Sequence, residues 1–342
     1  MNDAAKPSED LVKILGVLAE GGNLKTEQTQ AAMSILLSGE ASPTQIGAFL
    51  MGLRVKGETV EEISGLVTAM RAASLKVTPQ RDDLVDLCGT GGDGSGSFNI
   101  STAASLVVAG AGCGVAKHGN RSASSLCGSA DVLEALGVPI DLDAEGAAKA
   151  IDEHGFAFLF ARTYHPAMRF VGGPRSELRF RTVFNILGPM TNPATVRRQL
   201  IGVYHDGLRD TMANVLKSLG SEKVWVVHGH GGLDELSISG PTKITALHSG
   251  QMHVFSITPE DAGLQSHKLS ELVGGDASVN ARILQEVLGG KKGAHRDAVL
   301  LNAGAAIVVA GAEKEITAGV GRAAESIDSG AALACLDRAR GR

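Results

Sequence analysis

Residues 84–102 join an apolar run to a predicted helix through a loop rich in glycine. The run Leu84–Cys88 predicts a buried strand, and Asn99 marks the start of an apolar helix. Glycines lack the Cβ atoms that would keep a ligand away from the backbone, and here they stand at 89, 91, 92, 94 and 96. Successive backbone N–H groups and the positive end of the helix can then face an anion. The stretch therefore predicts a site for a phosphate-bearing ligand.

Two familiar phosphate-loop patterns fit this stretch less well. Gly89–Gly94 satisfies G-x-G-x-x-G, but the dinucleotide fold also requires an acidic residue at the end of the next strand. The next apolar run, from Gly114, ends on Lys117 and His118. The ATP-type pattern requires Gly-Lys-Ser/Thr after the loop, and the sequence has none there. If the two strands are parallel neighbours, Lys117 lies beside the glycine-rich loop and supplies a second phosphate contact.

Apolar runs alternate with helical segments from Asp83 onward. This alternation predicts an α/β fold with a mostly parallel central sheet and helices on both faces. The expected strands are Leu84–Cys88, Gly114–Lys117, Phe156–Phe160, Leu200–Tyr204 and Lys223–His228, with shorter ones at Thr242–His248 and Met252–Ile257. Helices are expected near Ser278–Leu288, Ala298–Gly311 and Glu325–Arg338.

The first part of the chain predicts a separate helical unit. Apolar residues recur at helical spacing between Ser8 and Ser74, and two capping boxes mark helix starts, at Ser42–Gln45 and Thr59–Glu62. We therefore expect a small all-helical domain at 1–74, followed by a larger α/β domain at 75–342. An arginine-rich helical segment interrupts the larger domain at 166–188.

Composition and charge exclude several classes of protein. A net charge of -5 disfavours a general nucleic-acid surface, which needs a basic stripe. The four cysteines include no close pair, so we expect neither a zinc site nor disulfides, which fits a cytoplasmic protein. No apolar run approaches the length of a membrane span, and the first residues lack the apolar core of a signal peptide.

Several ordered motifs resemble those of the anthranilate phosphoribosyltransferase family. They are Gly-Thr-Gly-Gly-Asp from Gly89, Lys-His-Gly-Asn-Arg-Ser from Lys117, Gly-Ser-Ala-Asp-Val-Leu-Glu from Gly128, Tyr-His-Pro-Ala-Met from Tyr164, Arg-Thr-Val-Phe-Asn from Arg181 and Gly-Leu-Asp-Glu from Gly232. The resemblance spans nearly the whole chain. It implies the fold shared by nucleoside phosphorylases and class IV phosphoribosyltransferases, in which the inserted segment 166–188 returns to the helical domain.

The resemblance also implies a reaction in tryptophan biosynthesis. The phosphoribosyl group of 5-phosphoribosyl 1-pyrophosphate (PRPP) moves to the amino group of anthranilate and pyrophosphate leaves, so C1 passes through an oxocarbenium-like state without a covalent nucleophile. Magnesium, as two ions with PRPP, is implied, with Ser101, Asp234 and Glu235 as its ligands. The matching PRPP positions are Gly89, Gly91, Gly92, Asp93, Asn99, Ser101, Thr102, Lys117 and Ser129.

For anthranilate the family points to Arg175 as the carboxylate partner, because a guanidinium binds a carboxylate in two places. The aromatic ring is implied to lie near Gly89, His118, Asn120, Tyr164 and His165. Orientation of the acceptor is the expected role of His118, with proton transfer as its alternative. Arg169, Arg179 and Arg181 are alternatives to Arg175. This chain has Arg179 where the family usually has glycine, and Cys127 where the family often has a small polar residue.

Two other functions compete with this one. Pyrimidine nucleoside phosphorylases have a similar architecture, but their loop differs from Gly-Thr-Gly-Gly-Asp-Gly-Ser. A non-catalytic, nucleic-acid-binding homologue should be basic and should lack the residues of the implied site, whereas this chain is acidic and keeps Lys117, Arg175, Asp234 and Glu235. Neither a nucleic acid nor a membrane is an expected partner. The apolar faces of the helical domain predict either packing against the larger domain or a dimer contact, and the resemblance implies a homodimer.

Overall fold

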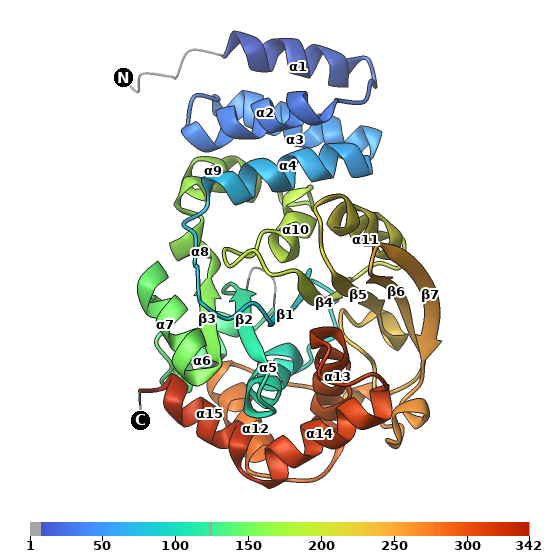
Figure 1. Ribbon diagram of the computed structural model, residues 1–342. Coiled ribbons are helices and arrows are strands. Elements are labelled where there is room, and N and C mark those ends of the chain that lie inside the picture. The colour runs from blue at the N-terminus through green and yellow to red at the C-terminus, as the bar shows by residue number, and fades with distance from the viewer. Residues whose placement is uncertain (1–7, 123–124, 342) are drawn as a thin grey trace.

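The fold is a stack of a helical bundle, a twisted sheet and a second layer of helices (Figure 1). The structure, a computed structural model, describes residues 8–122 and 125–341. The chain enters through the bundle at one end of the molecule and finishes among the helices at the opposite end. An α/β fold with a mostly parallel sheet and a small helical N-terminal unit is thereby confirmed.

The helical bundle is held by the local signals that its sequence carries. At the start of α3 (Pro43–Lys56) the Ser42 hydroxyl accepts from the Gln45 backbone N–H, and at the start of α4 (Val60–Ala73) the Thr59 hydroxyl accepts from that of Glu62, which confirms both capping boxes. The helix α9 (Arg169–Leu178), from the inserted segment, packs against α2 and α3. The bundle consists of α1 (Glu9–Ala19), α2 (Thr26–Ser38), α3 (Pro43–Lys56) and α4 (Val60–Ala73).

The sheet has seven strands in the order β3-β2-β1-β4-β5-β6-β7. Strands β1 to β5 run parallel, and β6 and β7 add to one edge in antiparallel pairing. Because β1 lies between β2 and β4, the carboxyl ends of these strands form one edge on which a ligand can sit. The strands are β1 (Leu84–Gly89), β2 (Gly114–Gly119), β3 (Phe156–Phe160), β4 (Arg198–Gly202), β5 (Lys223–His228), β6 (Thr242–His248) and β7 (Gln251–Ile257).

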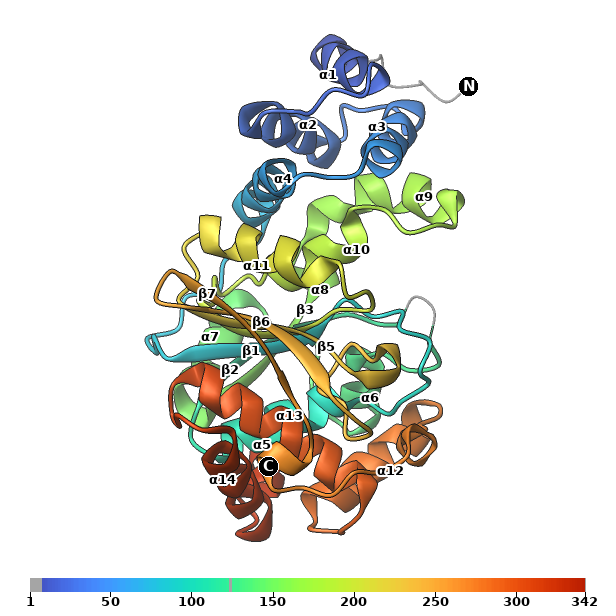
Figure 2. The ribbon, with the colours of Figure 1, turned by 90° about the vertical axis from the view of Figure 1, so that its right-hand side faces the viewer.

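Helices cover both faces of the sheet (Figure 2). On one face Val85, Leu87 and Val115 pack against α5 (Ile100–Gly110) and the C-terminal helices. On the other face Ile201 and Val224 share a core with α11 (Leu208–Ser218) and the helical bundle, so bundle and sheet are joined by continuous apolar packing. The remaining helices are α5 (Ile100–Gly110), α6 (Ser129–Ala135), α7 (Ala144–His154), α8 (Ala161–Tyr164), α10 (Phe184–Leu187), α11 (Leu208–Ser218), α12 (Ala277–Leu288), α13 (Ala294–Ala310), α14 (Ile316–Asp328) and α15 (Ala331–Ala339).

Two expected elements differ from the structure. The strand expected at Leu200–Tyr204 runs from Arg198 to Gly202. The single helix expected at Glu325–Arg338 is wrong, because α14 ends at Asp328 and α15 begins at Ala331. Gly330 between them has a φ of 81°, a left-handed conformation that breaks the helix and that glycine adopts without strain.

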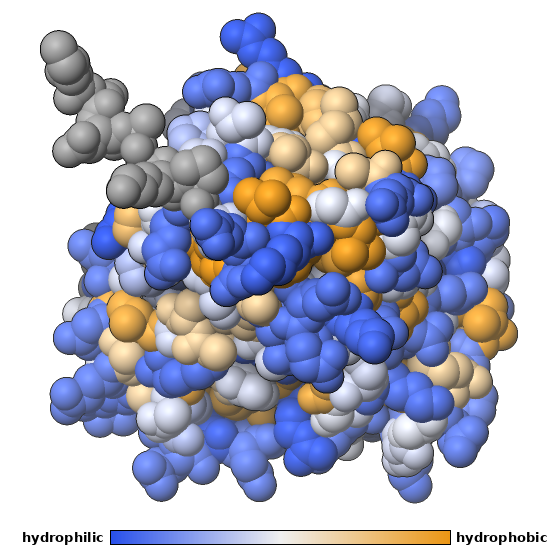
Figure 3. Space-filling view, turned by 90° about the horizontal axis from the view of Figure 1, so that it is seen from above, coloured by the Kyte–Doolittle hydropathy of each residue, from blue (hydrophilic) through white to orange (hydrophobic). Residues whose placement is uncertain are grey.

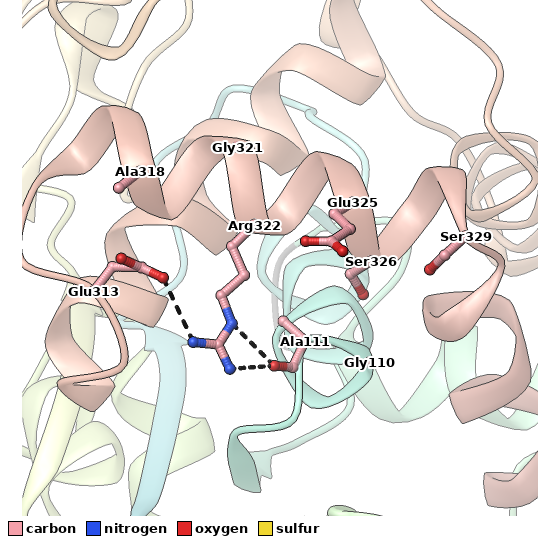
Figure 4. A pocket seen from close by; sticks show the side chains of 9 residues that line it. All are labelled: Gly110, Ala111, Glu313, Ala318, Gly321, Arg322, Glu325, Ser326 and Ser329. Atoms are coloured by element: carbon pink, nitrogen blue, oxygen red, sulfur yellow. Dashed lines mark hydrogen bonds and ion pairs between the residues drawn. The ribbon is translucent and has the colours of Figure 1, made fainter.

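The C-terminal end of α5 is capped by a side chain from α14 (Figure 4). Arg322 donates from Nε and Nη2 to the backbone oxygen of Ala111, at 3.1 and 2.8 Å, and its Nη1 lies 3.6 Å from Glu313. A cation at this position complements the negative end of the helix. A surface pocket of about 620 Å³ lies beside this contact, at the end of α5 that is remote from the glycine-rich loop. Among the described residues, no helix combines the length and the apolar character that crossing a membrane requires.

Candidate active site

The glycine-rich loop leaves β1 at the carboxyl edge of the sheet and is tied down at both ends. Thr90 N–H donates to the Gly202 oxygen at 2.9 Å, and Phe98 N–H donates to the Leu272 oxygen at 3.0 Å. Between these anchors Gly91 and Gly92 have φ values of 70° and 73°, which glycine adopts without strain. The loop backbone therefore has a fixed left-handed course at the point where the sequence predicts a phosphate.

The start of α5 keeps donors available for a ligand. The side chain of Asn99 does not cap its own helix but donates to the Cys127 oxygen at 3.2 Å. The Thr102 hydroxyl is buried and has no hydrogen-bond partner among the described residues. An unsatisfied hydroxyl at the N-terminus of a helix can donate to an anion there.

Lys117 lies beside this helix start, as expected from two parallel neighbouring strands. Its ammonium group donates to the Leu87 oxygen at 2.7 Å and to the Ser101 hydroxyl at 3.4 Å. The side chain is 1% exposed, and burial lowers the pKa of Lys117. Its contact with Ser101 places the buried cation on the α5 face of the sheet, where a phosphate would neutralise it.

Asp234 and Glu235 lie across the same edge, in the loop after β5. An Asp234 carboxylate oxygen accepts from Gly91 N–H at 2.6 Å, and a Glu235 oxygen accepts from Ser101 N–H at 3.1 Å. Loss of water raises the pKa of both carboxyl groups, and repulsion from neighbouring carboxylates adds to the shift. A cation bound between these carboxylates would offset both costs.

The oxygen donors at this edge fit magnesium. Mg²⁺ prefers carboxylates together with hydroxyl, water and phosphate oxygens, and is usually held by one or two carboxylates plus the substrate. Asp234, Glu235 and the Ser101 hydroxyl provide such a set. Within residues 8–122 and 125–341, no group of three or more His, Cys, Asp or Glu side chains is arranged to hold a metal unaided. The remaining ligands would come from water and substrate.

Two glycines allow the acidic loop to cross the strand ends. A Cβ atom on Gly202 would overlap the backbone of Asp234, and one on Gly89 would overlap its carboxylate. These residues are register partners in β4 and β1, so a surface without side chains supports Asp234. The two glycines explain why the acidic pair approaches the glycine-rich loop so closely.

His118 and His165 meet on the other face of the sheet. Their ring centres are 5.2 Å apart, and burial lowers the pKa of His118 to about 3 and that of His165 to about 4. His118 Nδ1 lies 3.1 Å from the Gly188 oxygen, which can only accept, so Nδ1 carries the proton. Nε2 is then a free acceptor, and it has no partner among the described residues.

A buried polar network that sequence reasoning missed fixes His118. One Asp86 oxygen accepts from His118 N–H at 3.1 Å, and the other accepts from the Asn192 amide at 2.9 Å. The same amide also donates to the Ala116 oxygen at 2.8 Å. Burial raises the pKa of Asp86 to about 6. An aspartate inside an otherwise apolar strand was the sequence signal for this network.

Asn120 and Ser129 also come together. The Ser129 hydroxyl donates to the Asn120 backbone oxygen at 3.2 Å, so the segment that follows β2 folds back onto the start of α6. Asp131 reinforces this turn, accepting from Gly128 N–H at 2.8 Å and pairing with Arg121 at 2.8 Å.

Tyr164, which the resemblance implies to lie near the aromatic substrate, occupies a core position. Its side chain is fully buried, and its hydroxyl donates to the backbone oxygens of Leu142 and Asp143 at 2.7 and 3.2 Å. The ring packs in a core beneath α7 with Val77 and Leu84. Tyr164 therefore anchors the segment that carries His165.

The structure separates the four candidate arginines by their surroundings. Arg175 is half-buried, lies 5.6 Å from the centre of the Phe184 ring, and has no carboxylate within ion-pair distance among the described residues. Arg179 is exposed at the end of α9, with a φ of 52°. Arg181 stacks on the Tyr204 ring at 3.6 Å and donates to the Gly92 oxygen, a link to the loop that sequence reasoning did not find. Arg169 stacks on Phe170 at 4.6 Å.

Comparison with known proteins identifies relatives over the whole fold. Residues 12–74 match the model of a glycosyl transferase family, helical bundle domain, and residues 81–333 match its a/b domain. The anthranilate phosphoribosyltransferase of Rhodopseudomonas palustris BisA53 is 54% identical over 327 residues, which cover 96% of each chain. That of Bradyrhizobium diazoefficiens is 52% identical over 328 residues, covering 96% of this chain and 97% of the relative.

Solved structures give the same picture. The anthranilate phosphoribosyltransferase of Thermus thermophilus superposes with a TM-score of 0.91 at 42% identity, covering 96% of this chain and 98% of that one. The Saccharomyces cerevisiae enzyme, in complex with PRPP and Mg, superposes with a TM-score of 0.89 at 29% identity and covers 98% of each chain.

Proposed function

This chain belongs to the anthranilate phosphoribosyltransferase family, and we propose which of its residues perform that family's reaction. The reaction transfers the phosphoribosyl group of PRPP to the amino group of anthranilate, releases pyrophosphate and is a step of tryptophan biosynthesis. The observation that best supports it here is the meeting of Lys117, Ser101 and Glu235 at the start of α5.

PRPP is proposed to lie along the carboxyl edge of β1, with its pyrophosphate and ribose at the glycine-rich loop. The loop N–H groups, the start of α5 and the Lys117 ammonium supply positive charge for its phosphates. Mg²⁺ would be held by Asp234, Glu235 and the Ser101 hydroxyl, with two ions as the proposed number, and would neutralise the leaving pyrophosphate. The proposed PRPP contacts are Gly89, Gly91, Gly92, Asp93, Asn99, Ser101, Thr102, Lys117 and Ser129.

Anthranilate is proposed to bind on the histidine side, between the sheet and the helical bundle. The histidine pair supports this position, since the rings of His118 and His165 lie 5.2 Å apart on this face of the sheet. Arg175 would bind the carboxylate, and Gly89, Asn120 and His118 would face the ring and amine. The position of Tyr164 supports an indirect role, through the placement of His165.

His118 is proposed to orient the amine through its Nε2 acceptor. Because the pKa of His118 is about 3, the ring is neutral and a weak base throughout the physiological range. We expect His118→Asn to keep kcat within about 10-fold of wild type. In the wild-type protein, titration of His118 should cause no inflection of the rate between about pH 6 and 8. Steady-state kinetics across that range tests the role, and a drop of about 10²-fold or more would instead assign proton transfer to His118.

Domain division and dimerisation are proposed together. The proposed units are 1–74 with 166–188, and 75–342.

Val12, Met51 and Val55 of the bundle are 52, 45 and 79% exposed, and Figure 3 shows apolar surface on this end of the molecule. We propose that a second copy of the chain packs against this apolar surface and forms a homodimer. Sedimentation equilibrium should give the mass of two chains, and Met51→Glu/Val55→Glu the mass of one; a single-chain mass for wild type at every concentration would reject the dimer.

The test of the function is loss of anthranilate fluorescence on mixing with protein, PRPP and Mg²⁺. Consumption that needs all three components, with pyrophosphate released, is the expected result. Phosphorolysis of thymidine or uridine without anthranilate consumption would favour a nucleoside phosphorylase. Nucleic-acid binding without either activity would favour a non-catalytic homologue. The cytoplasmic location stays a prediction.

A further inference from the structure

Asn302 lies in the middle of α13, a helix whose other central residues are apolar and buried. Its side chain is 0% exposed, yet all its hydrogen-bonding groups are used. The amide oxygen accepts from Leu236 N–H at 2.9 Å, and the amide nitrogen donates to the Leu236 oxygen at 2.9 Å and to the Ala298 oxygen at 3.0 Å. The pair with Leu236 satisfies both backbone groups of one residue in the way a neighbouring strand would.

Leu236 directly follows the acidic pair. The loop that carries Asp234 and Glu235 belongs to no strand, so it lacks the ladder that fixes a backbone in a sheet. Asn302 replaces that ladder at one position. Since α13 packs against β1, β4 and β5, the bond fixes the acidic loop relative to the strand from which the glycine-rich loop leaves.

The first turn of α5 completes the arrangement. Glu235 accepts from Ser101 N–H at 3.1 Å, so a shift of the loop backbone would separate the carboxylate from this helix start. Metal ligands keep their geometry through the groups that hold them, and loss of such a group weakens metal affinity by about 10- to 100-fold.

We propose that Asn302 is a positioning residue that holds Asp234 and Glu235 where they bind magnesium with PRPP. This rests on the proposed metal role of the acidic pair. A residue that only stabilises the fold would, when altered, lower the unfolding temperature without changing the need for Mg²⁺. A positioning residue changes the Mg²⁺ requirement itself.

Asn302→Thr separates these roles. Threonine has nearly the volume of asparagine, and its hydroxyl can bond the backbone oxygen one turn earlier, here that of Ala298. It therefore keeps the contact within α13 and removes both bonds to Leu236. Asn302→Ser does the same with less bulk, and serves if the threonine variant fails to fold.

The measurement is calorimetric titration of PRPP at a series of Mg²⁺ concentrations, without anthranilate, so no turnover occurs. We expect Asn302→Thr to need about 10-fold more Mg²⁺ for half-maximal PRPP binding. Ser326→Ala is the control, since it too removes buried hydrogen bonding, in this case the single bond from the Ser326 hydroxyl to the Val107 oxygen, at 2.8 Å. Val107 lies about 9 Å along α5 from Ser101.

The outcomes separate the two proposals. A raised Mg²⁺ requirement in Asn302→Thr, with Ser326→Ala unchanged, supports the positioning role. An unchanged requirement in folded Asn302→Thr or Asn302→Ser, or an equal rise in Ser326→Ala, overturns it. If Asp234→Asn/Glu235→Gln binds Mg²⁺ and PRPP like wild type, the metal role of the acidic pair fails first and the inference falls with it.

Discussion

Asp234→Asn/Glu235→Gln is expected to lower kcat/KM for PRPP by about 10³-fold, because charge developing on the leaving pyrophosphate loses its metal-mediated stabilisation. The stability of the fold should not decrease. Asn and Gln keep the oxygens that accept from Gly91 and Ser101. Neutral side chains also remove the burial of charge, which is the main cause of the raised pKa of both carboxyl groups, and the repulsion between carboxylates that adds to it. Steady-state rates and thermal unfolding should therefore diverge, with activity lost and the unfolding temperature unchanged or higher.

A matched control changes the same amount of charge elsewhere. Glu260 and Asp261 form an adjacent, exposed pair in the 3-10 helix Glu260–Ala262, and their carboxylates accept from the Ser266 and Thr258 hydroxyls. Glu260→Gln/Asp261→Asn should keep wild-type kinetics. Undiminished PRPP binding and turnover in the Asp234/Glu235 variant would show that these carboxylates are not ligands of the metal.

The fold was largely predictable because its signals are local. Apolar runs bounded by polar segments marked every strand, and the capping boxes at Ser42 and Thr59 marked two helix starts. The larger departure lies at residues 325–338, where the apolar spacing did not reveal the left-handed Gly330 that separates α14 from α15. A single glycine within a helical pattern does not reveal its φ, since tertiary packing sets it.

The site was predictable where residues adjoin in sequence, and less so where distant segments meet. The neighbourhood of Lys117 and the glycine-rich loop followed from parallel strands. The support of Leu236 by Asn302, of His118 by Asp86, and of the loop by Arg181 each spans dozens of residues. No period or spacing encodes such contacts. Tyr164 is a further example, since its packing in the core beneath α7 anchors the segment that carries His165.

Arg175→Ala is expected to raise KM for anthranilate by about 10²-fold, because two charge-assisted hydrogen bonds to the carboxylate contribute roughly 3 kcal/mol together. KM for PRPP should stay near wild type, since no PRPP contact is assigned to Arg175. Arg175→Lys should have a KM for anthranilate between those of wild type and Arg175→Ala, because an ammonium group keeps the charge but lacks the planar fork of the guanidinium. The measurement is initial rate against anthranilate concentration at saturating PRPP and Mg²⁺.

Arg179 supplies the matched control on the same segment. Its φ of 52° is a conformation that favours glycine, so glycine is structurally compatible with this position. Arg179→Gly should therefore leave KM for anthranilate within about 2-fold and unfold at an equal or higher temperature. Arg179→Ala should also keep KM near wild type, although it retains the backbone strain. Equal small effects of Arg175→Ala and Arg179→Ala would mean that another cation binds the carboxylate of anthranilate. Arg181, which donates to the Gly92 oxygen, would be the next arginine to replace.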